Sequence, residues 1–162
     1  MGVHDLRHYR APDGVVEMNS FPATASQTFL AGEPVQVVAA GTLSECATDP
    51  PTVDGIAAHG TTDVDGNSLG TTHPITVYGT SPNQVFISRR FATDGAGTAA
   101  TPALTNIGDF AGLSLSGGIW YVDTGAANAI IKIIGVQDIA GNDLGDPKVL
   151  PGTGVWVLFH FV

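Results

Sequence analysis

The chain has 162 residues, of which 43% are hydrophobic and only 13% are charged. This length suits one domain with a buried core, and the low charge excludes a disordered chain, because disorder needs high charge and few apolar residues. The 6 Lys and Arg residues against 15 Asp and Glu residues give a net charge of −9. Nucleic acid is therefore not expected as a partner, because phosphate backbones are bound through Lys and Arg.

The N-terminal segment, residues 1–20, is expected to form an extended arm ahead of a β-rich domain over residues 21–162. The arm has few apolar anchors, so little buried area would offset the entropy lost when it becomes ordered. We therefore predict that it is disordered in the free protein and orders against another chain. Tyr and Arg are favoured interface anchors, and the candidate partner-binding residues in the arm are Leu6, Arg7, Tyr9 and Arg10.

Short segments rich in β-branched residues follow one another through the rest of the chain, separated by Gly, Pro and Asp turn signals. This spacing predicts an all-β domain, an antiparallel sandwich or barrel, with no helix longer than two turns. The segment 92–106 is small, polar and Gly-rich, which is typical of a long mobile loop. Strands are expected at residues 35–38, 42–47, 53–58, 74–78, 85–91, 119–122, 129–136 and 155–162.

Two of these strands carry further information. The last strand, 155–162, has apolar residues on both of its alternating faces, so we expect it to lie in the interior of a sheet. The strand at 85–91 contains the pair Arg89 and Arg90. The pair either solvates an edge strand, where charge blocks aggregation, or contacts a partner. Arg89 and Arg90 are therefore added to the candidate partner-binding residues.

Signals for catalysis, metals or cofactors are weak. Cys46 is the only cysteine, so no internal disulfide can form, and it is expected to be a small buried apolar residue. Asp63 to Asn67, and the group Asp138, Asn142, Asp143 and Asp146, could hold calcium through oxygen ligands, but these residue types are also the ordinary residues of turns. His4 and His8 lack further zinc ligands nearby in the sequence. With no nucleophile or nucleotide motif, we expect neither an enzyme nor a cofactor.

Four aromatic residues near the C-terminus allow two interpretations. Trp120, Tyr121, Trp156 and Phe159 could form a flat platform for a sugar, or they could pack in the core. Trp120 and Tyr121 are adjacent in a predicted strand, so they point to opposite faces. We expect one of them to lie in the core and the other at its rim.

Several short motifs, taken in order, resemble the small head decoration proteins of tailed phages, also called capsid cement proteins. In that family a G-x-P-V strand precedes a G-I-A strand, and a later G-D, G-L and W-Y-V-D-T stretch leads to a final apolar strand. The resemblance covers residues 29–162. The motifs are FLAGEPV (29–35), VDGIA (53–57), IGDFAGL (107–113), WYVDT (120–124), IIGV (133–136) and VWVLF (155–159).

The resemblance implies a compact β-tulip-like body, often trimeric, on the outside of an expanded capsid in the virion after synthesis in the host cytoplasm. It implies the major capsid protein as partner, contacted by an N-terminal arm, with no catalysis and no cofactor. Independently of the resemblance, the chain has no run of about 18 apolar residues, so no membrane span is expected, and its acidity argues against nucleic acid. Two alternatives remain open. One is a phage tail or fibre subunit, although the repeats that are usual in fibres are absent from the sequence; the other is a carbohydrate-binding β-sandwich.

Overall fold

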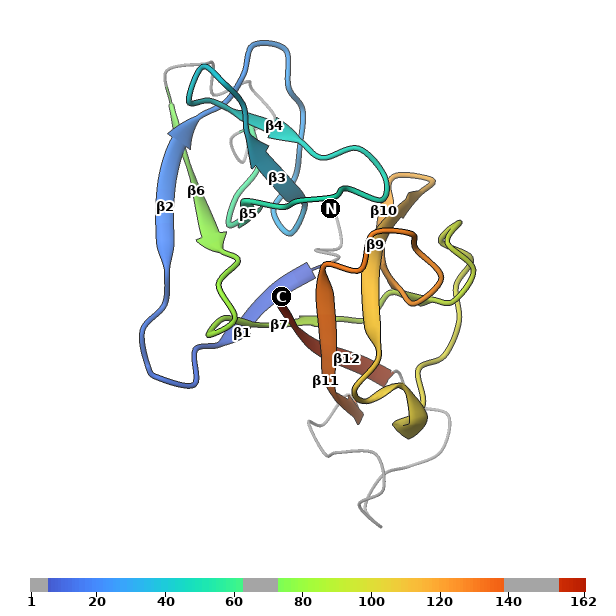
Figure 1. Cartoon of the computed structure of the whole chain (residues 1–162). Helices are drawn as coiled ribbons and strands as arrows, with labels where there is room; N and C mark the ends of the chain where they lie inside the picture. The colour runs from blue at the N-terminus through green and yellow to red at the C-terminus, as the bar shows by residue number, and fades with distance from the viewer. Residues whose placement is uncertain (1–5, 63–72, 139–154) are drawn as a thin grey trace.

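The protein folds into two open β-sheets, seen side by side in Figure 1. The structure is a computed structural model that describes residues 6–62, 73–138 and 155–162. Within these residues every neighbouring pair of strands is antiparallel except β8 and β10, which are parallel. The predicted all-β antiparallel sandwich is therefore confirmed, whereas the barrel alternative is not, because the sheets do not close.

The larger sheet has seven strands, and the smaller has five. In spatial order the larger sheet contains β1 (Leu6–Arg10), β7 (Val85–Ser88), β12 (Val155–Phe161), β11 (Ile131–Asp138), β9 (Phe110–Ser116), β10 (Ile119–Asp123) and β8 (Phe91–Ala92). The smaller sheet contains β2 (Met18–Pro22), β6 (Pro74–Gly79), β5 (Gly55–Ala57), β3 (Pro34–Val37) and β4 (Leu43–Glu45). A single short 3-10 turn, Leu104–Asn106, precedes β9 among the described residues.

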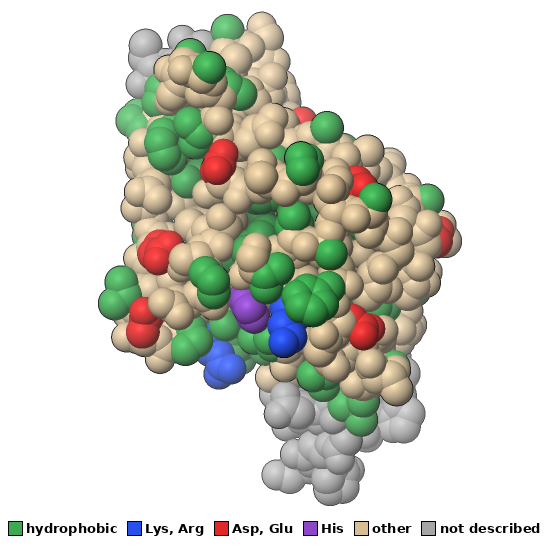
Figure 2. Space-filling view, in the orientation of Figure 1, with side chains coloured by type: hydrophobic (Ala, Val, Ile, Leu, Met, Phe, Trp, Pro, Cys, Tyr) green, Lys and Arg blue, Asp and Glu red, His purple; other side chains and the backbone are tan. Residues whose placement is uncertain are grey.

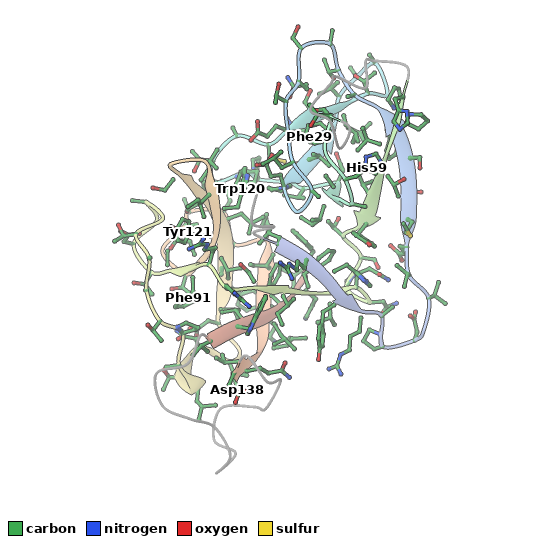
Figure 3. All side chains as sticks on the ribbon, turned by 180° about the vertical axis from the view of Figure 1, so that it is seen from behind. Phe29, His59, Phe91, Trp120, Tyr121 and Asp138 are labelled. Carbon is green, nitrogen blue, oxygen red and sulfur yellow. The ribbon has the colours of Figure 1, made fainter. Side chains whose placement is uncertain are left out.

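The interior strands β5 and β6 of the smaller sheet carry buried side chains on both faces, whereas the edge strand β2 is largely exposed. Successive residues of a strand point to opposite faces. Ile56 of β5 belongs to the core between the two sheets, and Tyr78 of β6 packs against it. The neighbouring Ala57 and Val77 belong to a second cluster, together with Phe29 of the loop before β3. Figure 3 shows Phe29 and His59 in this part of the molecule, away from Phe91, Trp120 and Tyr121 of the larger sheet.

Residues 6–20, the described part of the arm expected over residues 1–20, contain strand β1 and the start of strand β2 instead of an extended arm. Leu6–Arg10 is strand β1, which pairs with β7, and Leu6 is only 1% exposed in the main core. Met18–Pro22 is strand β2, which pairs with β6. These strands are ordered by the burial of one leucine and by backbone pairing with strands far away in the sequence. The local composition of the segment carries no signal for such distant contacts.

The C-terminal strand has the interior position that its pattern predicts. β12 lies between β7 and β11. Val157, Phe159 and Phe161 point into the main core, and Phe159 is fully buried. The phenyl rings of Phe159 and Phe161 both contact that of Phe86, with centroid separations of 5.9 and 5.4 Å. Aromatic contacts of this kind dominate the packing of a β-sandwich core.

The segment 92–106, expected to be a mobile loop, is anchored to the end of β10 by one carboxylate. Asp123 is fully buried. Its Oδ1 accepts hydrogen bonds from the backbone N–H groups of Gly95 and Gly125, and its Oδ2 accepts one from Gly97. A buried carboxylate held by backbone donors is strongly stabilised. The sequence prediction missed this anchor because its donors are backbone groups.

Candidate functional site

The outer face of the larger sheet carries a concentration of cationic and aromatic side chains. Residues that face each other across paired strands share one face of a sheet. One such row runs through Arg7, Ile87, Leu158 and Gly135 on four successive strands. Trp156 lies two residues from Leu158, so it points to this face as well. The opposite face carries core residues such as Leu6 and Val157, so this outer face lies on the side away from the main core.

Arg7 and Arg89 converge on the indole of Trp156. The guanidinium carbon of Arg89 lies 4.2 Å from the ring centroid, and that of Arg7 lies 5.8 Å from it. Both distances are within the range of a cation–π contact, which contributes about 0.5–1 kcal/mol at an exposed site. Both arginines are exposed, and Trp156 is partly buried. We call these three residues the Arg–Trp cluster.

A second cation lies farther along the same face. Lys132 of β11 is opposite His160 of β12 on one side and Phe110 of β9 on the other. Its ammonium nitrogen is 5.6 Å from the centroid of the Phe110 ring, and Phe110 is 57% exposed. Phe110 therefore adds exposed apolar area to a face that already carries three positive charges.

The cations of the Arg–Trp cluster have no carboxylate partner among the residues that the structure describes. Among the described residues, the contacts that the guanidinium groups of Arg7 and Arg89 make are those with Trp156. This is unexpected for a chain in which 15 acidic residues outnumber 6 basic ones. On the molecular face shown in Figure 2, the few visible Lys and Arg side chains lie in the lower half, and Asp and Glu side chains are spread over the rest of that face.

The structure brings together only some of the predicted partner-binding residues. Arg7 and Arg89 meet at Trp156. Tyr9 and Arg10 are exposed and contact each other, with the guanidinium carbon 5.6 Å from the ring centroid. Leu6 is the exception, because it is buried in the core and cannot reach a partner.

The predicted strand at 85–91 is divided, and this changes the interpretation of its arginine pair. Arg89 and Arg90 lie between β7 and the two-residue strand β8. β7 is an interior strand, so the edge-strand explanation does not hold for it. The backbone N–H of Arg90 donates to the Ser88 hydroxyl, and its C=O accepts from the N–H of Val122. Arg90 is therefore built into the sheet, whereas Arg89 is presented on its surface.

The structure decides between the two interpretations of the four aromatic residues, a sugar platform and core packing. Trp120 is fully buried and Tyr121 is 7% exposed, so both belong to the interior and neither forms a rim. Phe159 is also fully buried. Trp156 is left as the one partly exposed member of the four, with Arg89 over its ring. Its pairing with Arg7 had no sequence signal, because the two residues lie at opposite ends of the chain.

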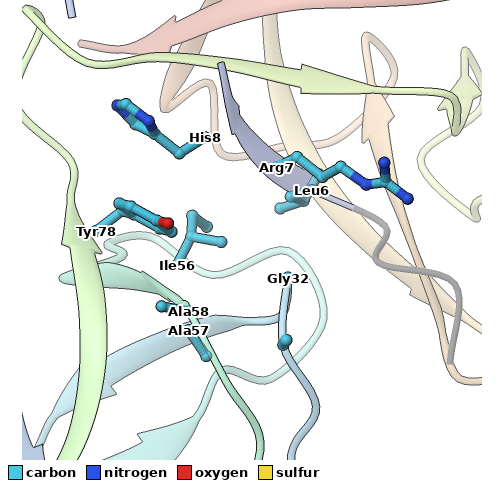
Figure 4. A pocket seen from close by; sticks show the side chains of 9 residues that line it. Leu6, Arg7, His8, Gly32, Ile56, Ala57, Ala58 and Tyr78 are labelled. Carbon is cyan, nitrogen blue, oxygen red and sulfur yellow. The ribbon is translucent and has the colours of Figure 1, made fainter. Parts of the chain in front are cut away.

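A pocket of about 220 Å³ opens between the sheets beside β1. Figure 4 shows Leu6, His8, Ile56 and Tyr78 around it, whereas the Arg7 side chain extends away. The rings of His8 and Tyr78 are stacked with centroids 4.7 Å apart, and His8 Nε2 lies 2.8 Å from Gln84 Oε1. Most of the surface that lines the pocket is apolar. Its lining residues are Leu6, Arg7, His8, Ala31, Gly32, Ile56, Ala57, Ala58 and Tyr78.

The predicted buried cysteine is confirmed. Cys46 is 3% exposed. Burial, with smaller contributions from the charges of Asp54 and Glu45, raises the pKa of its thiol to about 12. A thiol with this pKa is almost entirely protonated at neutral pH, so it is a poor nucleophile and a poor metal ligand.

Most residues of the calcium and zinc hypotheses lie outside the described part of the chain. Residues 63–67 and His4 fall there, as do Asn142, Asp143 and Asp146. Among described residues, no group of three or more His, Cys, Asp or Glu side chains is placed to hold a metal ion. Within the same residues, no helix is long and apolar enough to cross a membrane.

Comparison with known proteins gave no match to a family model, to a curated protein or to a solved structure.

Proposed function

We propose that this protein is a non-enzymatic structural virion protein that binds the outer surface of an expanded phage capsid and holds neighbouring capsomers together. The observation that carries the proposal is the meeting of Arg7 and Arg89, two residues expected from the sequence to bind a partner, at the exposed Arg–Trp cluster. Arg and Trp are the residue types that most often dominate the binding energy of protein interfaces. The ordered motifs that resemble capsid cement proteins supply the identity of the partner, the major capsid protein.

The charge distribution is consistent with this role. An acidic body keeps many copies soluble at the concentration needed for assembly. A cationic face on that body would orient each copy toward its binding site. Binding to neighbouring capsomers, with the protein as a homo-oligomer such as the trimer that the resemblance implies, would add avidity to weak individual contacts.

The test is co-sedimentation of the purified protein with expanded, undecorated heads of its own phage. We expect saturable binding at a fixed ratio to the major capsid protein, and heads that withstand higher temperature after binding. A folded protein that fails to bind such heads would contradict the proposal. Size-exclusion chromatography with light scattering, on the free protein, would measure the oligomeric state independently.

A carbohydrate-binding module is less well supported. A sugar platform needs an aromatic ring with an open face, but Trp120 is buried and the Trp156 ring is already in contact with Arg89. A glycan screen separates the two functions. Binding of a glycan that is lost in Trp156→Ala, together with no binding to heads, would favour the sugar-binding function.

A further inference from the structure

We infer that the Arg–Trp cluster is a recognition site for carboxylate groups, and that the partner reaches it with an acidic segment rich in Asp or Glu. The inference rests on the proposed function for the identity of the partner, but the chemistry of the site stands on the described residues alone. It specifies what the proposed function leaves open, namely which groups of a partner this face selects.

The first step is the state of the two guanidinium groups. Arg7 and Arg89 are exposed, contact the same indole, and have no ion pair or hydrogen bond to a carboxylate in the described part of the chain. Two positive charges near the same ring repel each other, and a bound anion would offset this unfavourable electrostatic energy. Stacking on Trp156 leaves the N–H edges of a guanidinium group free to bind a carboxylate, because cation–π contacts use the flat face of the group.

The second step is how these side chains are held. Arg7 lies on β1 and Trp156 on β12, and both strands are hydrogen-bonded to β7, which ends immediately before Arg89. The three side chains therefore project from one rigid sheet. Contact with the indole restricts the guanidinium groups, so less side-chain entropy is lost when an anion binds. Arg10 differs from this cluster, because within the described residues its side chain contacts the ring of its neighbour Tyr9 on the same strand.

The third step is the choice between possible anions. Lys132 and the exposed Phe110 lie on the same face, so the surface combines separated cations with apolar area. A protein segment that alternates carboxylates with apolar side chains matches this combination. The charge of −9 on the whole chain opposes binding of a polyphosphate backbone, whose charge density is much higher.

The test uses the full-length protein and two synthetic peptides, one of alternating Glu and Leu and one of alternating Gln and Leu. Binding is followed by NMR through the Arg Nε–H and Trp indole N–H signals. We expect the Glu peptide to shift the signals of Arg7, Arg89 and Trp156, and to lose at least tenfold in affinity when NaCl is raised from 0.05 to 0.5 M (on the order of a Debye length falling threefold). The Gln peptide is expected to leave these signals in place.

Matched variants separate a built site from net charge. Arg7→Gln and Arg89→Gln are each expected to weaken binding of the Glu peptide about tenfold, a loss typical of one charge-assisted hydrogen-bonded pair. Arg10→Gln removes one positive charge from an exposed position of the same strand, β1, outside the Arg–Trp cluster, and is expected to change affinity by less than about twofold. Arg89→Lys keeps the positive charge but lacks the planar N–H donors of a guanidinium group, so this variant is expected to retain only part of the wild-type affinity for the Glu peptide. Circular dichroism of each variant checks folding.

Three outcomes would overturn the inference: equal binding of the two peptides, equal effects of Arg10→Gln and Arg89→Gln, or no shift at Arg7, Arg89 and Trp156. The same variants in head co-sedimentation distinguish this inference from the proposed function. Heads bound equally well by wild type and by Arg7→Gln/Arg89→Gln would contradict the carboxylate site and leave the cement function standing. Glu-peptide binding without head binding would do the reverse.

Discussion

At the scale of single residues, the most informative side chain is the buried carboxylate of Asp123. Its two oxygens accept three backbone N–H groups. Asp123→Asn would place an NH₂ donor against at least one of these N–H donors. We expect a loss of about 1–3 kcal/mol in the free energy of unfolding, measured with urea, because a buried donor would be left unsatisfied.

Asp94 in the same segment provides the control. Asp94 is exposed, and its carboxylate accepts from the Thr98 side chain and, through Oδ1, from the backbone N–H groups of Ala96 and Thr98. An asparagine keeps Oδ1 as the acceptor of the two backbone bonds and leaves no buried donor unsatisfied. Asp94→Asn is expected to leave the denaturation midpoint unchanged. Equal effects of the two substitutions would show that the anchoring role assigned to Asp123 is wrong.

Cys46 gives a prediction about alkaline pH. Its pKa of about 12 in the folded protein is above the ordinary value of 9.0. The folded state therefore holds the thiol proton more tightly than the unfolded state, so the stability that this difference contributes is fully present below pH 9 and is lost as the pH rises toward 12. Urea denaturation of wild type and Cys46→Ala should show a steeper decline for wild type over this window. Parallel pH profiles would contradict the raised pKa.

At the scale of elements, strand β1 changes the expected behaviour of the N-terminal region. Leu6 is 1% exposed in the main core, so Leu6→Ala is expected to cost about 2–5 kcal/mol, measured by urea denaturation. Tyr9 on the same strand is exposed, so Tyr9→Ala is the control and should lower the free energy of unfolding much less. Hydrogen exchange should also show protection of the Arg7 amide in the free protein. Rapid exchange of the Arg7 amide, with a small effect of Leu6→Ala on stability, would instead support the prediction that the N-terminal arm is disordered.

Deletion of residues 1–12 would not be a clean test of partner binding, because it would remove strand β1 together with the buried Leu6. Substitution of the exposed Arg7, which keeps the strand, tests the surface without removing a core residue. The distinction follows from alternation along β1, where Leu6 points to the core and Arg7 to the outer face.

The elements were predictable where their signal is local. The two apolar faces of residues 155–162 predict a strand in the interior of a sheet, and the structure confirms this position. Strand β9 was not among the predicted strands, because Gly112 interrupts its apolar run. A side chain at Gly112 would collide with the Asn128 carbonyl, so glycine is required there by close packing.

The candidate site was predictable only in part. Arg7 and Arg89 were singled out from residue type, but their meeting at Trp156 depends on the strand order β1–β7–β12. That order pairs strands separated by most of the chain. Periodicity and turn signals describe neighbours in the sequence, so they carry no information on such a juxtaposition.

At the scale of the whole molecule, the question is whether the two sheets unfold together. Both tryptophans lie in the larger sheet, so their fluorescence reports on that sheet, whereas circular dichroism reports on both. Ile56 of the smaller sheet is part of the main core, which couples the two. We therefore expect fluorescence and circular dichroism to give coincident transitions in urea.

Two conservative substitutions test this coupling. Ile75→Val lies in the second cluster and Ile133→Val in the main core, and both residues are fully buried. Each is expected to cost about 0.5–1.5 kcal/mol and to move both signals by the same amount. If Ile75→Val moved only the circular dichroism transition, the sheets would be independent folding units.

The pairing of β1 with β7 has one more consequence. Arg10 and Val85 are cross-strand partners, so the chain leaves the larger sheet after β1 and returns beside the same point. The five-stranded sheet thus occupies an insertion between two adjacent strands, in the place where a hairpin would need only a tight turn. The two ends of this long connection lie next to each other in the larger sheet, but the connection also supplies Ile56 to the main core, so replacing it with a tight turn would uncover that core.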